Sequence, residues 1–94
     1  MLLTVDSVLE QNRYLPATIV DDQVVVLGLD AGAYFDFNRS ATEIWCAFSA
    51  PRKVEEILSD LARQHGVGFE AIAHDVLPFL EQLVEQKLLR VFGT

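Results

Sequence analysis

The stretch YFDFNRSATEIW, residues 34–45, passes directly from a strand pattern into an amphipathic helix pattern. Side chains alternate between the two faces up to Phe37, as they do in a strand with one buried face. After Asn38 the apolar residues recur at helical spacing. The junction predicts a small strand-then-helix domain in which one edge of the sheet has no partner. Because backbone donors and acceptors at such an edge need partners, an unpaired edge beside an apolar groove can bind an extended peptide.

Two β-branched runs before this stretch predict a hairpin. They cover residues 17–20 and 23–29, and Asp21-Asp22 lies between them as a turn. A second turn is expected at Asp30-Ala31-Gly32, where Gly32 can adopt a positive φ. Residues 33–37 then form the third strand. The three strands together predict an antiparallel meander.

The first helix has two possible starting points in the sequence. Ser40 and Glu43 have the spacing of a capping box, in which each side chain satisfies a free backbone amide. Asn38 is a competing cap, two residues earlier. The helix is expected to end at Ser49-Ala50-Pro51.

Two further helices are predicted, followed by a short closing strand or an ordered tail. The second helix begins at Val54 and stops at Gly66, and the third covers residues 69–87. Pro78 lies inside the third pattern, so that this helix either kinks there or begins near Asp75. Its apolar stripe is wider than one contact surface needs; it comprises Ile72, Val76, Phe79, Leu80, Leu83 and Val84.

The chain ends supply two weaker strand patterns, at residues 3–8 and 88–92. We therefore expect one α+β domain over residues 1–94: a three-stranded antiparallel sheet followed by three helices. This order of elements also suits a winged helix-turn-helix-like fold.

Composition and charge exclude several classes of function. Hydrophobic residues make up 51% and charged residues 22% of the chain, which is ordinary globular usage. The net charge of -7 repels phosphate backbones and anionic membranes. The first residues lack the pattern of a signal peptide, and no apolar run approaches the ~18 residues of a membrane span. We expect a cytoplasmic protein with no nucleic-acid or membrane partner.

Candidate catalytic and metal-binding residues are few. Cys46 cannot form an internal disulfide, and its place in a helix beside Trp45 favours a buried, inert thiol. His65 and His74 have no cysteine or carboxylate pair at metal-ligand spacing. We predict no catalytic residue, no metal and no cofactor. A DNA-binding regulator is the competing class, but its third helix would carry four acidic residues towards the phosphates.

Peptide binding is the function that the pattern favours, and it depends on the third strand and the third helix. In the strand, Phe35 and Phe37 share one face while Tyr34 and Asp36 point the other way. The apolar residues of the helix would receive the side chains of the guest, although each is at least as readily explained as core. The predicted peptide-binding residues are Ala33, Tyr34, Phe35, Asp36, Phe37, Asp75, Val76, Phe79, Leu80 and Leu83. Asp36 and Asp75 could recognise a basic residue of the peptide.

A family resemblance rests on several segments taken in order and at their spacing. They are residues 37–45 (FNRSATEIW), residues 54–57 (VEEI) with Leu61, Asp75-Val76 with Phe79-Leu80 and Leu83-Val84, and Leu88-Leu89. With these segments the chain resembles the PqqD-like family of peptide-recognition elements from the biosynthesis of ribosomally made, modified peptides. Two features depart from the family pattern: Lys53 replaces a small capping residue, and Pro78 interrupts the last helix.

The resemblance implies a winged-helix-like fold that binds the leader segment of a precursor peptide as an added strand, without catalysis. Among family members the chain looks most similar to the stand-alone lasso-peptide version. That version delivers the precursor to a separate leader peptidase and a cyclase, and its leader carries the spacing YxxP. The alternative within the family is a peptide chaperone for a radical-SAM enzyme in quinone-cofactor (PQQ) biosynthesis. A structural partner of a larger enzyme is a third possibility.

Overall fold

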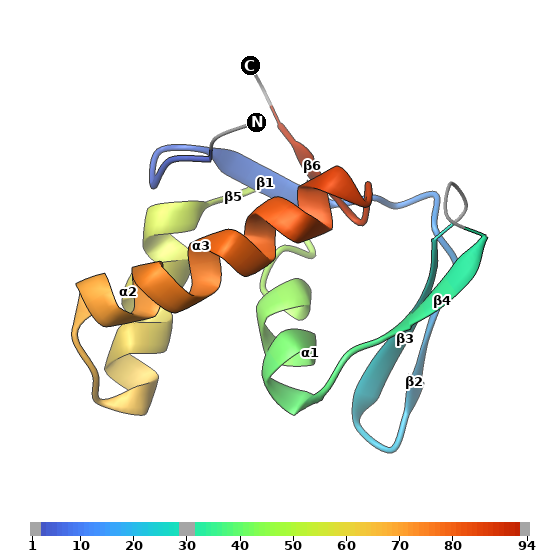
Figure 1. Cartoon of the computed structure of the whole chain (residues 1–94), viewed down its shortest axis with the longest axis horizontal. Helices are drawn as coiled ribbons and strands as arrows, with labels where there is room; N and C mark the ends of the chain where they lie inside the picture. The colour runs from blue at the N-terminus through green and yellow to red at the C-terminus, as the bar shows by residue number, and fades with distance from the viewer. Residues whose placement is uncertain (1–2, 29–31, 93–94) are drawn as a thin grey trace.

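Two small antiparallel sheets and three helices make up the part of the chain that the computed structural model describes, residues 3–28 and 32–92 (Figure 1). The elements are, in chain order, β1 (Val8–Gln11), β2 (Ala17–Val20), β3 (Gln23–Gly28), β4 (Ala33–Asp36), α1 (Arg39–Cys46), β5 (Arg52–Lys53), α2 (Val54–His65), α3 (Phe69–Glu85) and β6 (Leu89–Val91). One sheet has the strand order β2-β3-β4 and the other β5-β1-β6. The expected α+β order, a three-stranded antiparallel sheet followed by three helices, is confirmed.

The predicted hairpin is present, and its two-residue turn has the expected geometry. Val20 pairs with Gln23 across the turn, and Asp21 and Asp22 have φ of 52° and 65°. Positive φ at both central positions matches the right-handed twist of the flanking strands. Gly32 also has a positive φ, of 64°. The rest of the second predicted turn and the end of the predicted strand, residues 29–31, lie outside the described residues.

The second sheet was only partly predicted. Its central strand is Val8–Gln11, so the prediction of a strand at residues 3–8 was wrong. Glu10 is buried within this strand, and its carboxylate pairs with Arg90 Nε at 3.0 Å. The closing strand falls within the predicted residues 88–92 and pairs with β1, whereas β5 was not predicted.

The first helix begins at the earlier of the two candidate caps. The Asn38 side chain accepts a hydrogen bond from the backbone N–H of Ala41 at 2.8 Å. The Ser40–Glu43 capping box is therefore wrong, because Ser40 already lies inside the helix. The hydroxyl of Thr42 accepts a bond from the Val24 N–H at 3.0 Å, which holds α1 against β3.

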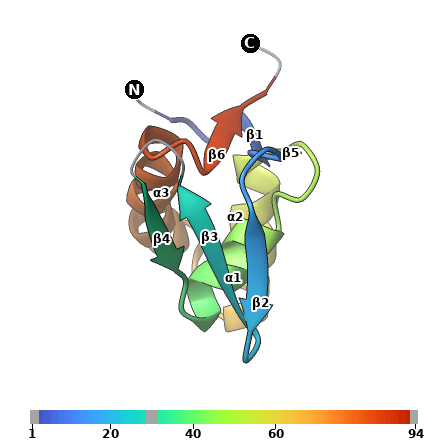
Figure 2. The same ribbon diagram turned by 90° about the vertical axis from the view of Figure 1, so that its right-hand side faces the viewer.

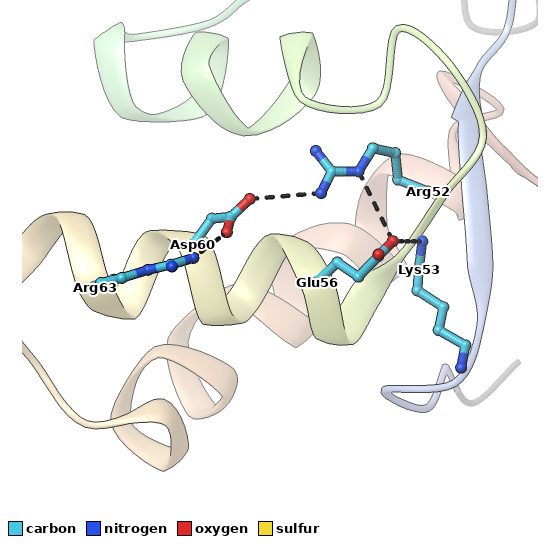
Figure 3. Close-up of polar contacts among 5 residues, drawn as sticks. All are labelled: Arg52, Lys53, Glu56, Asp60 and Arg63. Atoms are coloured by element: carbon cyan, nitrogen blue, oxygen red, sulfur yellow. Dashed lines mark hydrogen bonds and ion pairs between the residues drawn. The ribbon is translucent and has the colours of Figure 1, made fainter.

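The second helix runs from Val54 to a left-handed C-cap at Gly66 with φ of 66°, as predicted. Lys53 has no side-chain acceptor, and Glu56 instead accepts the Lys53 backbone N–H at 3.3 Å. Figure 3 shows Arg52 between Glu56 and Asp60, with an Nε–Oε1 distance of 3.8 Å to Glu56 and an Nη2–Oδ2 distance of 3.5 Å to Asp60. Arg63 pairs with the other oxygen of Asp60. Half-exposed pairs of this kind contribute little each, about 0–1 kcal/mol, but they tie α2 to β5.

The third helix contains Pro78 and is a single element from Phe69 to Glu85. A start near Asp75 is therefore wrong. Pro78 cannot donate to the carbonyl of His74, four residues earlier. Both residues are exposed, so water can satisfy that carbonyl.

The hydrophobic core lies between the helices and both sheets. Figure 2 shows β2, β3 and β4 across one side of the molecule, with α1 behind them and α3 beside them. The fully buried large side chains come from all these layers; they include Phe48, Leu9, Ile57, Leu58, Leu80, Leu88 and Leu89. Within residues 3–28 and 32–92, no helix has both the length and the apolar character needed to cross a membrane.

Candidate peptide-binding site

The β4 strand forms one edge of its sheet, because β3 is its only neighbour among the described strands. The Phe37 N–H donates to the Val24 carbonyl at 2.9 Å. In an antiparallel pair the residues alternate between those bonded to the neighbour and those directed away from it. Phe35, two residues before Phe37, therefore bonds towards β3. The N–H and C=O groups of Tyr34 and Asp36 point to the open edge.

A groove runs between this strand and α3, and we call it the β4–α3 groove. Its volume is about 550 Å³. It is lined by Phe35, Asp36, Phe37, Asn38, Ala41, Phe79, Gln82, Leu83, Glu85, Gln86 and Leu88. An extended chain paired to β4 would lie along this groove, with alternate side chains directed into it.

A second hollow, the helical pocket, continues the groove between the three helices. It has a volume of about 400 Å³ and is lined by Asn38, Ser40, Ala41, Glu43, Ile44, Leu61, His65, Ile72, Asp75, Val76 and Phe79. Asn38, Ala41 and Phe79 line both hollows. The Phe79 ring also makes an edge contact with Phe37, with 6.3 Å between ring centroids. Phe79 thus lies at the junction of the groove and the pocket.

The predicted site residues differ in their burial in the structure. Tyr34, Asp36 and Asp75 are exposed, and the Tyr34 side chain is 71% exposed. Phe35 and Phe79 are half-buried, while Phe37, Val76 and Leu83 are buried but line the hollows. Leu80 is fully buried and lines neither hollow, so the structure places it in the core. Ala33 belongs to β4, and only its backbone is described.

Sequence reasoning missed the contribution of α1 to the site. Asn38 and Ala41 line both hollows, and Glu43 and Ile44 line the helical pocket. In the sequence, Ala41 and Ile44 have the spacing of one helix face, which by itself indicates packing against a core. The same spacing would have been a signal that this face is shared between core and pocket.

The ionisable side chains that line the two hollows are carboxylates and one histidine. Asp36 and Glu85 line the groove, and Glu43 and Asp75 line the helical pocket with His65. Two carboxylates in each of the two adjoining hollows create a negative potential that favours a basic or neutral guest.

Catalytic chemistry has little support among the described residues. In residues 3–28 and 32–92, no group of three His, Cys, Asp or Glu side chains could hold a metal ion. Cys46 is exposed rather than buried as predicted, because α1 ends at this residue. Partial burial nevertheless raises the pKa of the Cys46 thiol, which lowers the fraction of reactive thiolate.

Comparison with known families identifies the chain. Residues 23–89, which span both the edge strand and α3, match the family model described as Coenzyme PQQ synthesis protein D (PqqD). The chain belongs to the PqqD family. Domains of this family are non-catalytic, peptide-binding elements, which confirms the prediction that the chain is not an enzyme. At the level of the family, the function is recognition of the leader segment of a ribosomally made precursor peptide.

Two solved structures are similar over nearly the whole chain. TbiB1 in complex with the TbiA(beta) leader peptide has 25% identity and a TM-score of 0.75, and the match covers 90% of this chain and 96% of TbiB1. The PqqD truncation of Methylobacterium extorquens PqqCD, a stand-alone RiPP recognition element solved by NMR, has 19% identity and a TM-score of 0.74, with 94% of each chain covered. No curated protein matches the chain. The likeness confirms the winged helix-turn-helix-like fold of recognition elements.

Proposed function

We propose that this PqqD-family chain binds the leader segment of a precursor peptide as a fourth strand on the edge of β4. The observation that carries the proposal is the coincidence of an open edge with a groove. Tyr34 and Asp36 direct their N–H and C=O groups outwards, and the β4–α3 groove lies beside the same strand. Main-chain hydrogen bonds would supply affinity, and the groove would select side chains.

The apolar contacts of the guest would centre on Phe79. This ring is half-buried in the free protein and lines both hollows, so a bound side chain could cover its remaining surface. Partly exposed aromatic rings in pockets are frequent hot spots of peptide interfaces. Phe35, Val76 and Leu83 complete the apolar lining on either side. The Leu80 side chain packs in the core under α3 and would not contact the guest.

The acidic lining supports a leader that carries a basic residue. Asp36 lies beside the open edge, and Asp75 lies on the rim of the helical pocket with 82% of its side chain exposed. An exposed carboxylate loses little hydration when it approaches a lysine or arginine, so that pairing costs little. The contribution is mainly to orientation and to the rate of association, and we expect it to weaken as salt is added.

A lasso-peptide precursor is the specific guest that we propose. TbiB1, the structural neighbour with 25% identity, is itself bound to a leader peptide. The resemblance described above implies a leader with the spacing YxxP, and the helical pocket of about 400 Å³ could receive an aromatic ring. The chain would then present the precursor, in the cytoplasm, to a leader peptidase and a cyclase.

The alternative guest is the precursor of a quinone cofactor, presented to a radical-SAM enzyme. The description of the matching family, a coenzyme PQQ synthesis protein, favours it. The two guests are distinguished by titrating the chain with a leader that contains YxxP and with a quinone-cofactor precursor. The proposal requires the tighter complex with the first peptide.

The experiment that tests the site is a titration of the ¹⁵N-labelled chain with the leader, followed by NMR. Strand addition predicts that the Tyr34 and Asp36 amides shift and become protected from exchange with solvent. The amides of Phe35 and Phe37, which bond towards β3, should keep their protection throughout. Leader binding without new protection at Tyr34 and Asp36 would contradict strand addition at β4.

A further inference from the structure

The opposite edge of the same sheet is also open. β2 pairs only with β3 among the described strands, and all of its residues are exposed. The Pro16 carbonyl accepts a bond from the Leu27 N–H at 2.9 Å, so Pro16 and Thr18 bond towards β3. The N–H and C=O groups of Ala17 and Ile19 therefore point away from the sheet. Figure 2 shows β2 and β4 on the two sides of β3.

An apolar hollow of about 470 Å³, the β2 pocket, lies beside this edge. It is lined by Gln11, Ala17, Thr18, Ile19, Val24, Trp45, Cys46 and Ser49, none of which is an acidic or basic residue. Ile19 and Val20 are large apolar side chains with exposures of 68% and 54%. Trp45 forms part of the wall, and its buried indole Nε1 has no acceptor among the described residues.

Natural edge strands are normally protected from pairing by a lysine, a proline or an inward-pointing charge. The strand β2 is short, with the sequence ATIV, and Pro16 directly precedes it; the four residues of the strand itself include no lysine, proline or charge. Charge appears only at one end of the strand, where Asp21 and Asp22 are both exposed in the turn. The edge is therefore uncharged along its length and acidic at the hairpin end.

We propose that the β2 edge docks an extended, apolar segment of the enzyme that processes the bound precursor, with a basic residue of that segment beside Asp21 and Asp22. The proposal rests on the proposed function, because it requires a precursor on β4. Pairing at Ala17 and Ile19 would supply the main-chain bonds, and alternate side chains would enter the β2 pocket. The guest on β4 and the enzyme on β2 would share β3 without competing for an edge.

Charge argues for a basic enzyme segment over a second copy of this chain. Each copy carries a net charge of -7, so that two copies would meet with repulsion. A segment with a lysine or arginine at its end instead matches the acidic turn. The leader itself is assigned to the other edge, because the acidic groove and the helical pocket lie beside β4 and not beside β2.

The test uses one proline at each edge as a matched pair. Ile19→Pro and Tyr34→Pro each remove one outward N–H from an exposed position of an edge strand, where proline is tolerated. The probes are the synthetic leader peptide and the purified leader peptidase from the same gene set, each titrated against the full chain. Circular dichroism of both variants checks that the fold is retained.

We expect Ile19→Pro to weaken peptidase binding by about tenfold, the equivalent of one lost hydrogen bond, and to leave leader affinity unchanged. Tyr34→Pro should do the reverse. In the double variant D21N/D22N, asparagine keeps the positive φ of the turn, so that about a threefold loss of peptidase affinity at low salt would show the charge contribution.

Every other pattern of results overturns the inference. Leader binding with no peptidase binding, or peptidase binding that Ile19→Pro leaves intact, removes the β2 edge as a docking site while the proposed function stands. Self-association of the wild-type chain that Ile19→Pro abolishes would assign the edge to a second copy. Loss of leader binding in Ile19→Pro, with none in Tyr34→Pro, would overturn the proposed site as well.

Discussion

Replacement of Tyr34 by proline isolates the backbone contribution to leader binding. Tyr34 is on the open edge of β4, and its amide is directed away from β3. Proline removes that donor and leaves the bonds between β3 and β4, which involve Phe35 and Phe37, in place. The free energy of unfolding should therefore change by less than about 1 kcal/mol.

The expected loss of binding follows from the single missing donor. A hydrogen bond of this kind contributes about 1 kcal/mol net, and a distorted neighbour in the ladder could raise the loss to about 2 kcal/mol. The dissociation constant of the leader should then rise by about fivefold to thirtyfold. Isothermal titration calorimetry of the full chain with the synthetic leader measures the change directly.

Tyr34→Ala is the matched control, because it removes the side chain and keeps the N–H. The Tyr34 side chain is 71% exposed and lines neither hollow, so alanine should weaken binding less than proline does. Equal losses in the two variants would refute the reasoning, since the backbone would then not be the contact.

Three further predictions concern the groove, the second sheet and the thiol. Phe79→Ala should weaken leader binding by about tenfold and lower the free energy of unfolding by about 2 kcal/mol, because the ring packs on Phe37 and lines both hollows. Unchanged leader affinity in calorimetry would exclude Phe79 from the interface. Glu10→Gln should lower the free energy of unfolding, measured by urea denaturation, by about 1–3 kcal/mol, because the buried carboxylate pairs with Arg90 at 3.0 Å. A smaller loss would show that the Glu10–Arg90 pair is not important for stability. Because the pKa of the Cys46 thiol is raised, less thiolate is present at a given pH, and alkylation by iodoacetamide should require a higher pH in the folded chain than in the unfolded chain. Identical pH profiles for the folded and unfolded chains would contradict the raised pKa.

The parts of this fold that can be predicted from the sequence are those whose backbone geometry depends on residues adjacent along the chain. The Asp21-Asp22 turn and the Gly66 cap both need a positive φ, which the sequence signals through residue type. The sequence left the N-cap of α1 undecided between Asn38 and Ser40, and the structure shows that Asn38 is the cap, because its side chain accepts a bond from the Ala41 N–H. Pro78 made a helix start near Asp75 one of two alternatives, and that alternative was wrong, because the sequence does not show whether water can reach the carbonyl that proline leaves free.

The sequence by itself determined the hairpin, the helices and the presence of a strand before α1, since each depends on local conformational preference and on the period of apolar residues. That this strand is an edge was decided by the sheet order β2-β3-β4. Only the tertiary structure decided that β1 pairs with β5 and β6, because those partners lie far along the chain. It also decided that Leu80 belongs to the core and Phe79 to the groove, although both lie on the same apolar stripe. A helical period shows which face is apolar, but what covers that face depends on where β4 and α1 are placed by the rest of the fold.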